Sequence, residues 1–307
     1  MAVLDEDAAR LLAVMASRGA VDITTMTPQA VRAHYDAFGG PTGRAVHEVR
    51  QLTIPGPGGD MGARLYRPSA APDLPVLVWY HGGGMVIGSL KGADWVCREL
   101  SVQAGTMVVS VDYRLAPEAK FPAAVEDAYA AAAWVAANAA ALGGDPTRVS
   151  VGGDSAGGTC GAVTCLLARQ RGGPSLRAQL LIYPGTDRDL TRPSVTEFAN
   201  GPILTKAAML WFRGHYHSEE SELSDPRASP ALAENHSGLP PACVLTAEID
   251  PIRDAGENYA RLLAQAGVMT SMKRYSGVYH GFFTMGPFMA KTMQAISDAA
   301  HFLTTAP

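Results

Sequence analysis

A serine between glycines, directly after an apolar run, constrains this chain more than any other feature. Residues 148–152 read as the end of a strand, Gly153-Asp154-Ser155-Ala156-Gly157 follows, and a helix of small residues comes next. Glycines on both sides allow the strained backbone angles of a tight strand-to-helix turn and let the helix pass close to the strand. The pattern predicts an α/β protein in which Ser155 is a nucleophile at the end of a strand.

Strands and helices alternate along most of the chain. The expected strands are 49–54, 61–66, 76–80, 106–111, 149–151, 179–183, 242–247 and 270–275, and the expected helices are 93–104, 122–142, 155–170, 252–265 and 288–303. Several strands are short continuous apolar runs, as in a parallel sheet with helices on both faces. Prolines and glycines at 55–59 join the first two strands, and they favour an antiparallel pair with a loop of more than two residues.

Two helical stretches lie outside this alternation. The apolar spacing predicts helices within the first 40 residues, and residues 185–223 separate two strands with a polar and then aromatic segment. We expect 185–223 to be an inserted helical lid. The remainder, 45–184 and 224–307, is expected to form one α/β domain with a mostly parallel central sheet.

Composition excludes several classes of protein. A net charge of −4 provides no basic surface for nucleic acid and no polybasic patch for a membrane. No apolar run approaches the roughly 18 residues that span a bilayer. Acidic residues at positions 5–7 stand where an export signal is basic, so we expect a cytoplasmic protein. The four cysteines lack metal-type spacing, which predicts buried free thiols and no metal site.

A second glycine motif points to the same chemistry. His81-Gly82-Gly83-Gly84 follows the apolar strand 76–80, and a glycine run there exposes backbone N–H groups that can point at a developing oxyanion. A nucleophilic serine and an oxyanion-binding loop together predict acyl transfer. His81 itself is expected to shape this loop rather than to move protons.

The serine needs a base and an orienting acid. His280 is the best-placed histidine, because it follows strand 270–275 in a loop that can reach over the sheet edge. Asp250 follows strand 242–247 and is the preferred acid, with Asp254 and Glu248 as rivals and a helix N-cap as its other interpretation. The chain order of serine, acid and histidine is the one expected of an α/β-hydrolase.

These motifs resemble the bacterial hormone-sensitive-lipase-like family of α/β-hydrolases. Besides the two glycine motifs, the matching segments are 112–118, 121–124, 181–184, 250–254 and 280–282. The resemblance implies Ser155 as nucleophile, Asp250 as acid and His280 as base, with an oxyanion hole made by the N–H groups of Gly83, Gly84 and Ala156. It also implies a helical cap made of residues 1–44 and 185–223, and no cofactor.

By the same resemblance we expect a carboxylic ester hydrolase. It would act on short- to medium-chain acyl esters through an acyl-enzyme, with a small-molecule ester and water as partners. An amidase or deacetylase with the same triad is the alternative, and a non-catalytic ligand-binding protein on this scaffold is a more distant one. The family further suggests a homodimer through strand 270–275.

Aromatic and sulfur side chains near the motifs are candidates for the substrate pocket. They are Met85, Trp211, Phe212, Phe282 and Phe283, and ordinary core packing is the alternative for each. Met85 also departs from the aromatic residue that the family often has after the glycine run. We expect Arg114 and Glu118 to hold loops by ion pairs, and Asp154 to brace the loop beside the nucleophile.

Overall fold

The sheet has the predicted architecture. In the computed structural model, which describes residues 2–19, 21–38 and 41–307, eight strands form one sheet in the order β1-β2-β4-β3-β5-β6-β7-β8. The strands are β1 (Glu48–Gly56), β2 (Gly59–Arg67), β3 (Leu74–Tyr80), β4 (Met107–Val111), β5 (Gly144–Asp154), β6 (Gln179–Ile182), β7 (Ala242–Ile249) and β8 (Thr270–Tyr279). β2 pairs antiparallel with β1 and β4, and every other pair is parallel, so the antiparallel start is confirmed.

The loop between β1 and β2 is shorter than expected. The two strands pair as far as Gly56 and Gly59, which leaves only Pro57 and Gly58 between them. The prediction of a longer loop was wrong because it excluded Pro55 from the strand. β1 lies at the edge of the sheet, where a proline is tolerated because its missing N–H can face away from the neighbouring strand.

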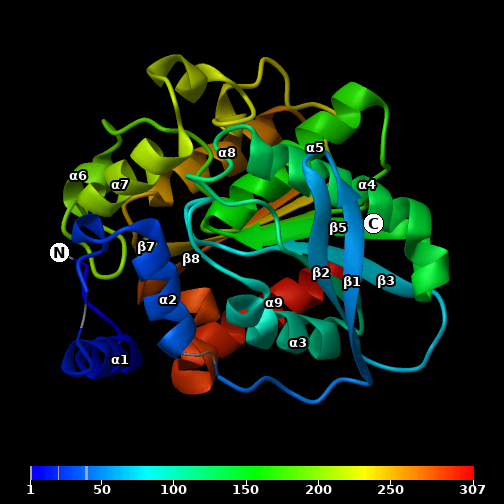
Figure 1. Cartoon of the computed structure of the whole chain (residues 1–307), viewed down its shortest axis with the longest axis horizontal. Coiled ribbons are helices and arrows are strands. Elements are labelled where there is room, and N and C mark those ends of the chain that lie inside the picture. Colours follow the sequence, from blue (N-terminus) through cyan, green and yellow to red (C-terminus); the bar gives the residue numbers. More distant parts are fainter. Residues whose placement is uncertain (1, 20, 39–40) are drawn as a thin grey trace.

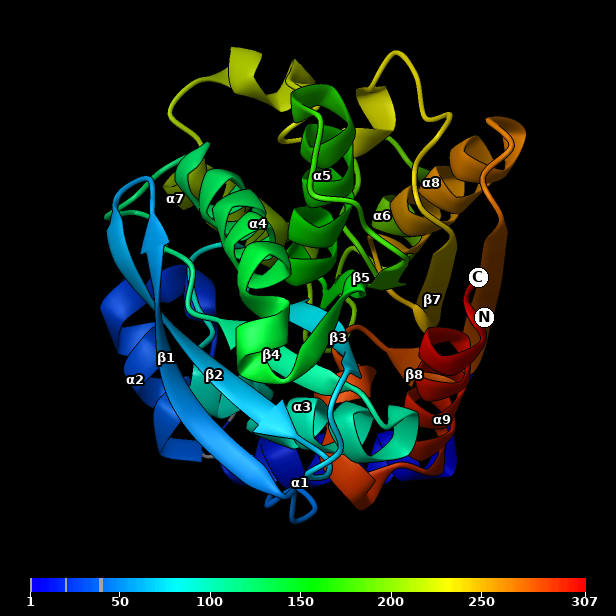
Figure 2. The ribbon, with the colours of Figure 1, turned by 90° about the vertical axis from the view of Figure 1, so that its right-hand side faces the viewer.

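Helices cover both faces of the sheet (Figure 2). α4 (Ala123–Leu142), α5 (Ala156–Arg171) and α8 (Arg253–Gln265) lie on one face, and α3 (Leu90–Ala104) and α9 (Ala290–Thr305) lie on the other. Each face buries its own apolar core, one centred on α4 and α5 and one on α3 and α9. α3 and α4 both end at a glycine in the left-handed region, Gly105 and Gly143.

Two further groups of helices lie together on one side of the molecule (Figure 1). The first contains α1 (Glu6–Ser17), the 3₁₀ turn η1 (Ile23–Thr25) and α2 (Pro28–Phe38), and the second contains α6 (Pro193–Glu197), α7 (Lys206–Tyr216) and η2 (Glu220–Ser224). α7 contacts η1, so segments far apart in the sequence meet here. The remaining short 3₁₀ turns are η3 (Pro230–Leu232), η4 (Phe282–Thr284) and η5 (Gly286–Phe288).

Ion pairs attach the loops and the N-terminal helices to the sheet domain. Arg114 pairs with the buried Asp127 at 2.7 Å, and Glu118 pairs with Arg32 of α2 at 2.8 Å. Arg32 also donates to the carbonyl of Ala116 at 2.6 Å. The expectation that Arg114 and Glu118 hold loops by ion pairs is confirmed, and Glu118 also fastens α2 onto the sheet domain.

All four cysteines are buried and unbridged, as predicted. Within the described ranges, none of the helices combines the length and the apolar character needed to cross a membrane. Nor do the side chains of those ranges bring together three or more metal-binding groups.

Candidate active site

Ser155 stands on a strained turn between β5 and α5. Its backbone has φ 53° and ψ −117°, and its amide donates to the carbonyl of Ile182 on β6 at 2.9 Å. Positive φ in a residue other than glycine costs on the order of 1–3 kcal/mol and is concentrated at functional sites. Gly157 makes the turn possible, because a Cβ there would lie 1.9 Å from the carbonyl oxygen of Tyr80.

The register of the last two strands places the acid beside the histidine. Ile249 at the end of β7 is opposite Tyr279 at the end of β8, so the residues that follow, Asp250 and His280, are neighbours. His280 Nδ1 lies 2.7 Å from Asp250 Oδ2, and His280 Nε2 lies 2.9 Å from Ser155 Oγ. A carboxylate only accepts, so Nδ1 carries the proton and Nε2 is left to accept from the serine hydroxyl.

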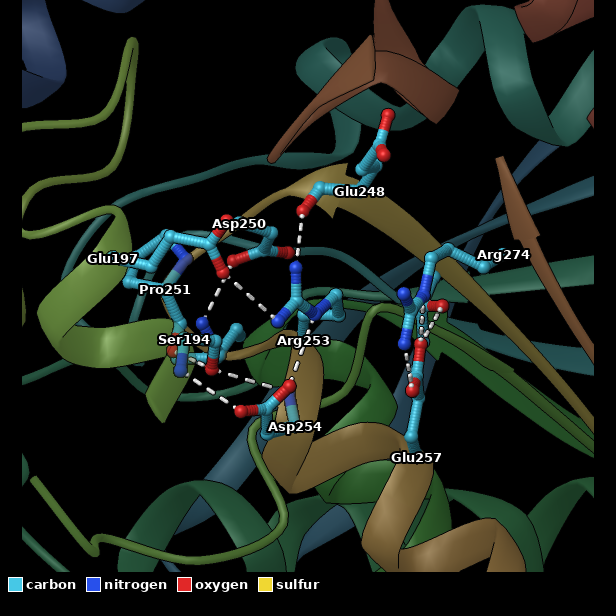
Figure 3. A network of polar contacts seen from close by, with 11 residues as sticks. Ser194, Glu197, Glu248, Asp250, Pro251, Arg253, Asp254, Glu257 and Arg274 are labelled. Atoms are coloured by element: carbon cyan, nitrogen blue, oxygen red, sulfur yellow. Dashed lines mark hydrogen bonds and ion pairs between the residues drawn. The ribbon is translucent and has the colours of Figure 1, made fainter. Parts of the chain in front are cut away.

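The rival acids have other partners, and Figure 3 shows those of Asp254. Asp254 accepts from the Ser194 amide at 2.8 Å and from Arg253 Nε at 2.9 Å. Glu248 accepts from the Gly277 amide at 2.7 Å. Neither carboxylate makes a hydrogen bond or ion pair with His280 among the residues that the structure describes.

The network around Arg253 instead supports the turn that carries Asp250 (Figure 3). Arg253 Nη1 donates to the Glu248 carbonyl at 3.0 Å, and Ser194 Oγ of α6 donates to the Pro251 carbonyl at 2.8 Å. Asp250 itself accepts from the Ile252 amide at 2.9 Å through its second oxygen. The acid is therefore held between the start of α8 and the inserted segment, and α8 itself has no side-chain N-cap.

The glycine loop has two amides without an acceptor among the described residues. Gly82 donates to Asp154 Oδ1 at 3.0 Å, whereas the amides of Gly83 and Gly84 have no acceptor within the described part of the chain. Both glycines have positive φ, 119° and 61°. A Cβ at Gly84 would lie 2.4 Å from Cδ1 of Phe212 on α7, so only glycine fits this approach. The contact between Gly82 and Asp154 confirms the bracing role expected of this aspartate.

His81 serves the loop rather than the proton transfer, as expected. The Tyr113 hydroxyl donates to the His81 carbonyl at 2.7 Å, and the two rings stack at 4.4 Å between centroids. Burial lowers the pKa of His81, which favours the neutral ring.

The buried Asp154 carboxyl predicts a pH-dependent stability. Burial raises its pKa from 3.8 to about 6, although the Gly82 hydrogen bond and the charge of His280 oppose this. Because the folded-state pKa is the higher one, the stabilisation from the protonated carboxyl is complete below about pH 3.8 and is lost as the pH rises through about 6. Over this range the unfolding free energy of the wild type should fall by up to about 3 kcal/mol. Asp154→Asn has no carboxyl to titrate, so its unfolding free energy should not show this fall. Urea denaturation of both proteins across this range measures the difference, and parallel pH profiles would contradict the prediction.

A cavity of 1180 Å³ opens at Ser155 and His280. Its walls come from the glycine loop, from the N-terminal helices and from the inserted segment. Met85 and Phe212 border this cavity, as proposed for pocket residues.

Three other pocket candidates do not line the cavity. Phe282 and Phe283 are completely buried in the core with α9, where Phe283 stacks on Trp79 at 6.2 Å. Trp211 packs against the other core and against His215 at 4.4 Å between ring centroids. The prediction failed for Trp211 because adjacent positions on a helix point to different sides, and Phe212 is the one that faces the glycine loop. It failed for Phe282 and Phe283 because an apolar ring gains more by filling the core.

Sequence reasoning missed two residues of the cavity that follow β6. Tyr183 lies against the His280 ring at 4.7 Å between centroids, and Arg188 enters the cavity a few residues later. The available signal was positional, because ligands of α/β sheets bind beyond the carboxyl ends of the strands.

Comparisons with known proteins agree with this geometry. A family model described as "alpha/beta hydrolase fold" matches residues 77–284. The carboxylic ester hydrolase LipN of Mycobacterium tuberculosis is 45% identical over 274 residues, which cover 87% of this chain and 72% of that protein. The carboxylesterase NlhH of the same species is 47% identical over 228 residues, 73% of this chain and 71% of that protein.

Solved structures show the same similarity. The ester-hydrolase EH1AB1 from the metagenome of Lake Arreo, complexed with a derivative of bipyridine phosphonate, has a TM-score of 0.94 and 41% identity, with 98% of both chains covered. The hyperthermophilic esterase of Pyrobaculum calidifontis has a TM-score of 0.93 and 42% identity, with 99% of this chain and 98% of that chain covered.

Proposed function

Because this chain belongs to the α/β-hydrolase family and is a carboxylic ester hydrolase, we propose that Ser155, His280 and Asp250 are its catalytic triad. The observation that carries the proposal is the hydrogen-bonded series from Asp250 through His280 to Ser155, at 2.7 and 2.9 Å. A serine hydroxyl at such a distance from an imidazole oriented by a carboxylate is the arrangement that activates it as a nucleophile.

Acylation begins when Ser155 Oγ attacks the ester carbonyl carbon. The hydroxyl proton moves to His280 Nε2, and the carbonyl electron pair moves onto oxygen, where the N–H groups of Gly83, Gly84 and Ala156 hold the oxyanion. One such donor typically contributes ~10²–10³ in rate. The tetrahedral intermediate then collapses, the C–O bond to the alcohol breaks, and His280 protonates the leaving oxygen.

Deacylation repeats these steps with water. His280 removes a proton from the water as its oxygen attacks the acyl-serine, and it returns that proton to Ser155 Oγ as the acid departs. Asp250 keeps the proton on Nδ1 and stabilises the imidazolium without becoming protonated itself. No step requires a metal or an organic cofactor.

We expect activity to be highest on short- to medium-chain acyl esters. The wall of the cavity carries charged groups, among them Arg188, Arg192 and Arg213, which a long alkyl chain would have to desolvate. Hydrolysis of p-nitrophenyl esters from acetate to palmitate should therefore peak between butyrate and octanoate. Maximal turnover on palmitate would contradict this and indicate a lipase, and p-nitroanilides of the same acids measured in parallel test the amidase alternative.

Several features stay predictions. The division into a cap of 1–44 and 185–223 and a catalytic domain of 45–184 and 224–307 is supported by the cavity walls, and residues 1, 20, 39 and 40 lie outside the described residues. Four unbridged thiols support a reducing, cytoplasmic location, and the mycobacterial relatives support a bacterial source. The position of β8 at the sheet edge supports a homodimer through that strand.

A further inference from the structure

Within the part of the chain that the structure describes, one arginine of the active-site cavity has no counter-ion. Of the arginines that line the cavity, three are ion-paired, namely Arg32 with Glu118, Arg192 with Asp187 and Arg213 with Glu220. Arg188 forms neither a hydrogen bond nor an ion pair with any residue in the described part of the chain, and its Nε is fully buried. The guanidinium is therefore shielded from water on one side and open to the cavity on the other.

Arg188 lies close to the nucleophile's helix. A Cβ at Gly185 would be 3.2 Å from Arg188 Nη1 and 3.6 Å from Thr159 Oγ1, so the guanidinium and Thr159 flank the same glycine. Thr159 stands one turn of α5 beyond Ser155 and donates to the Gly185 carbonyl at 2.7 Å. The cation thus sits on the wall nearest the start of α5, in the cavity that contains Ser155.

A second buried polar group accompanies the arginine. Tyr216, at the end of α7, also lines the cavity, and its buried hydroxyl has no hydrogen-bond partner among the described residues. Arg188 and Tyr216 thus line the same cavity, each with a buried polar atom that has no partner in the described part of the chain. Buried polar groups of native proteins are rarely left unpaired. Among the described residues that line the cavity, Trp79, His81 and Tyr183 also have such an atom, but Arg188 is the one whose side chain is always charged, so it has the strongest need of a ligand.

The neighbouring carboxylate does not neutralise Arg188. Asp187 accepts from Arg192 Nε at 3.0 and 2.9 Å through its two oxygens, so it is committed to that arginine. Burial lowers the pKa of Arg188, against the effects of Tyr216 and Asp187, yet an arginine side chain stays protonated in proteins. The cavity therefore contains a positive charge that the protein itself leaves uncompensated.

We propose that Arg188 and the Tyr216 hydroxyl bind a carboxylate of the substrate, so that the enzyme acts on esters that carry a free carboxylate, such as monoesters of dicarboxylic acids. The proposal rests on the proposed ester hydrolysis at Ser155. A guanidinium fork donates two parallel hydrogen bonds to a carboxylate, and a phenolic hydroxyl supplies a third. Such charge-assisted bonds are among the strong ones in a water-poor site, and they would orient the ester relative to Ser155.

Two matched pairs of esters test the proposal. Monoethyl glutarate against ethyl valerate places the carboxylate on the acyl side, and 4-acetoxybutyrate against butyl acetate places it on the alcohol side. In one pair the wild type should have the higher kcat/KM for the charged ester. Arg188→Gln should lower the charged-to-neutral ratio in that pair by about 10- to 100-fold, mainly through KM, since hydrogen bonds to charged groups contribute most. Tyr216→Phe should lower it several-fold.

Arg171→Gln is the matched control. It removes the same charge at the far end of α5, outside the residues that line the cavity, where the guanidinium pairs with Glu126 at 2.8 Å, so the ratio should stay within about twofold of the wild type. If Arg188→Gln does not fold, Arg188→Lys keeps the charge without the fork and should still lower the ratio.

The outcomes separate this proposal from the proposed function. Ester hydrolysis with no preference for either charged ester, or with a ratio unchanged in Arg188→Gln, overturns the carboxylate site and leaves the esterase intact. If the folded protein hydrolyses no ester, the proposed function fails, and ligand-observed NMR with glutarate still decides the site. Binding to the wild type that is lost in Arg188→Gln supports it, and no binding or equal binding overturns it.

Discussion

Ser155→Ala should lower kcat for p-nitrophenyl butyrate by about 10⁴- to 10⁶-fold, the range seen when the nucleophile of a triad is removed. The alanine keeps the backbone of the turn but has no oxygen to form the acyl-enzyme. His280→Ala should have an effect of the same order. In the wild type His280 Nε2 lies 2.9 Å from Ser155 Oγ, and without it the serine has no base to take its proton. Initial rates with circular dichroism on each variant measure both turnover and fold.

A matched serine controls for the substitution itself. Ser221 lies in η2, where its hydroxyl donates to the exposed Glu219 at 3.2 Å and to no other described residue, so Ser221→Ala should keep wild-type activity. Folded Ser155→Ala with more than about a tenth of wild-type turnover would show that another group is the nucleophile.

Asp250→Asn should lower kcat by about 10⁴-fold. The buried carboxylate is the acceptor for His280 Nδ1 at 2.7 Å, and it also accepts from the Ile252 amide. An asparagine that turns its NH₂ group toward the ring requires an unprotonated Nδ1, which moves the proton to Nε2 and leaves Ser155 without a base. The pH dependence of kcat for wild type and variant, measured on one neutral ester, follows this change.

Asp254→Asn is the informative comparison, since it makes the same chemical change four residues along the chain. Asp254 contacts Arg253 and Ser194 instead of His280, so we expect kcat to fall by no more than about tenfold. Stability should fall by about 1–2 kcal/mol through the weakened charged hydrogen bonds. An inactive Asp254→Asn beside an active Asp250→Asn would reverse the assignment of the acid.

Local patterns in the chain are sufficient to predict the framework of this protein. The apolar runs of the parallel sheet, the glycine-flanked Ser155 and the loop at Gly83 and Gly84 each depend on neighbouring residues, because strand burial and tight turns are local properties. The order of Ser155, Asp250 and His280 along the chain predicted the proposed triad, and the hydrogen bonds between these residues agree with that prediction. These parts of the site follow from sequence because each stands at the end of a recognisable strand.

Other parts were decided only when the chain packed. β7 and β8 shift register between Ala247 and Ile249, and this irregularity brings Tyr279 opposite Ile249 and so His280 beside Asp250. A hydrophobic pattern does not predict such a shift, because the extra residues of a bulge change the pairing without changing the composition. The positions of the aromatic rings were also decided by packing. Phe282 and Phe283 are buried in the core, where apolar burial is favourable, whereas Phe212 packs against Gly84.

Arg188 shows the difference most clearly. The sequence by itself determined that an arginine follows β6 between two aspartates, which reads as an ordinary charged loop. Only the tertiary structure pairs Asp187 with Arg192 and leaves Arg188 at the cavity of Ser155 without a partner among the described residues. The physical reason is that pairing of charges depends on distances in space, and residues adjacent in an extended segment point to opposite sides.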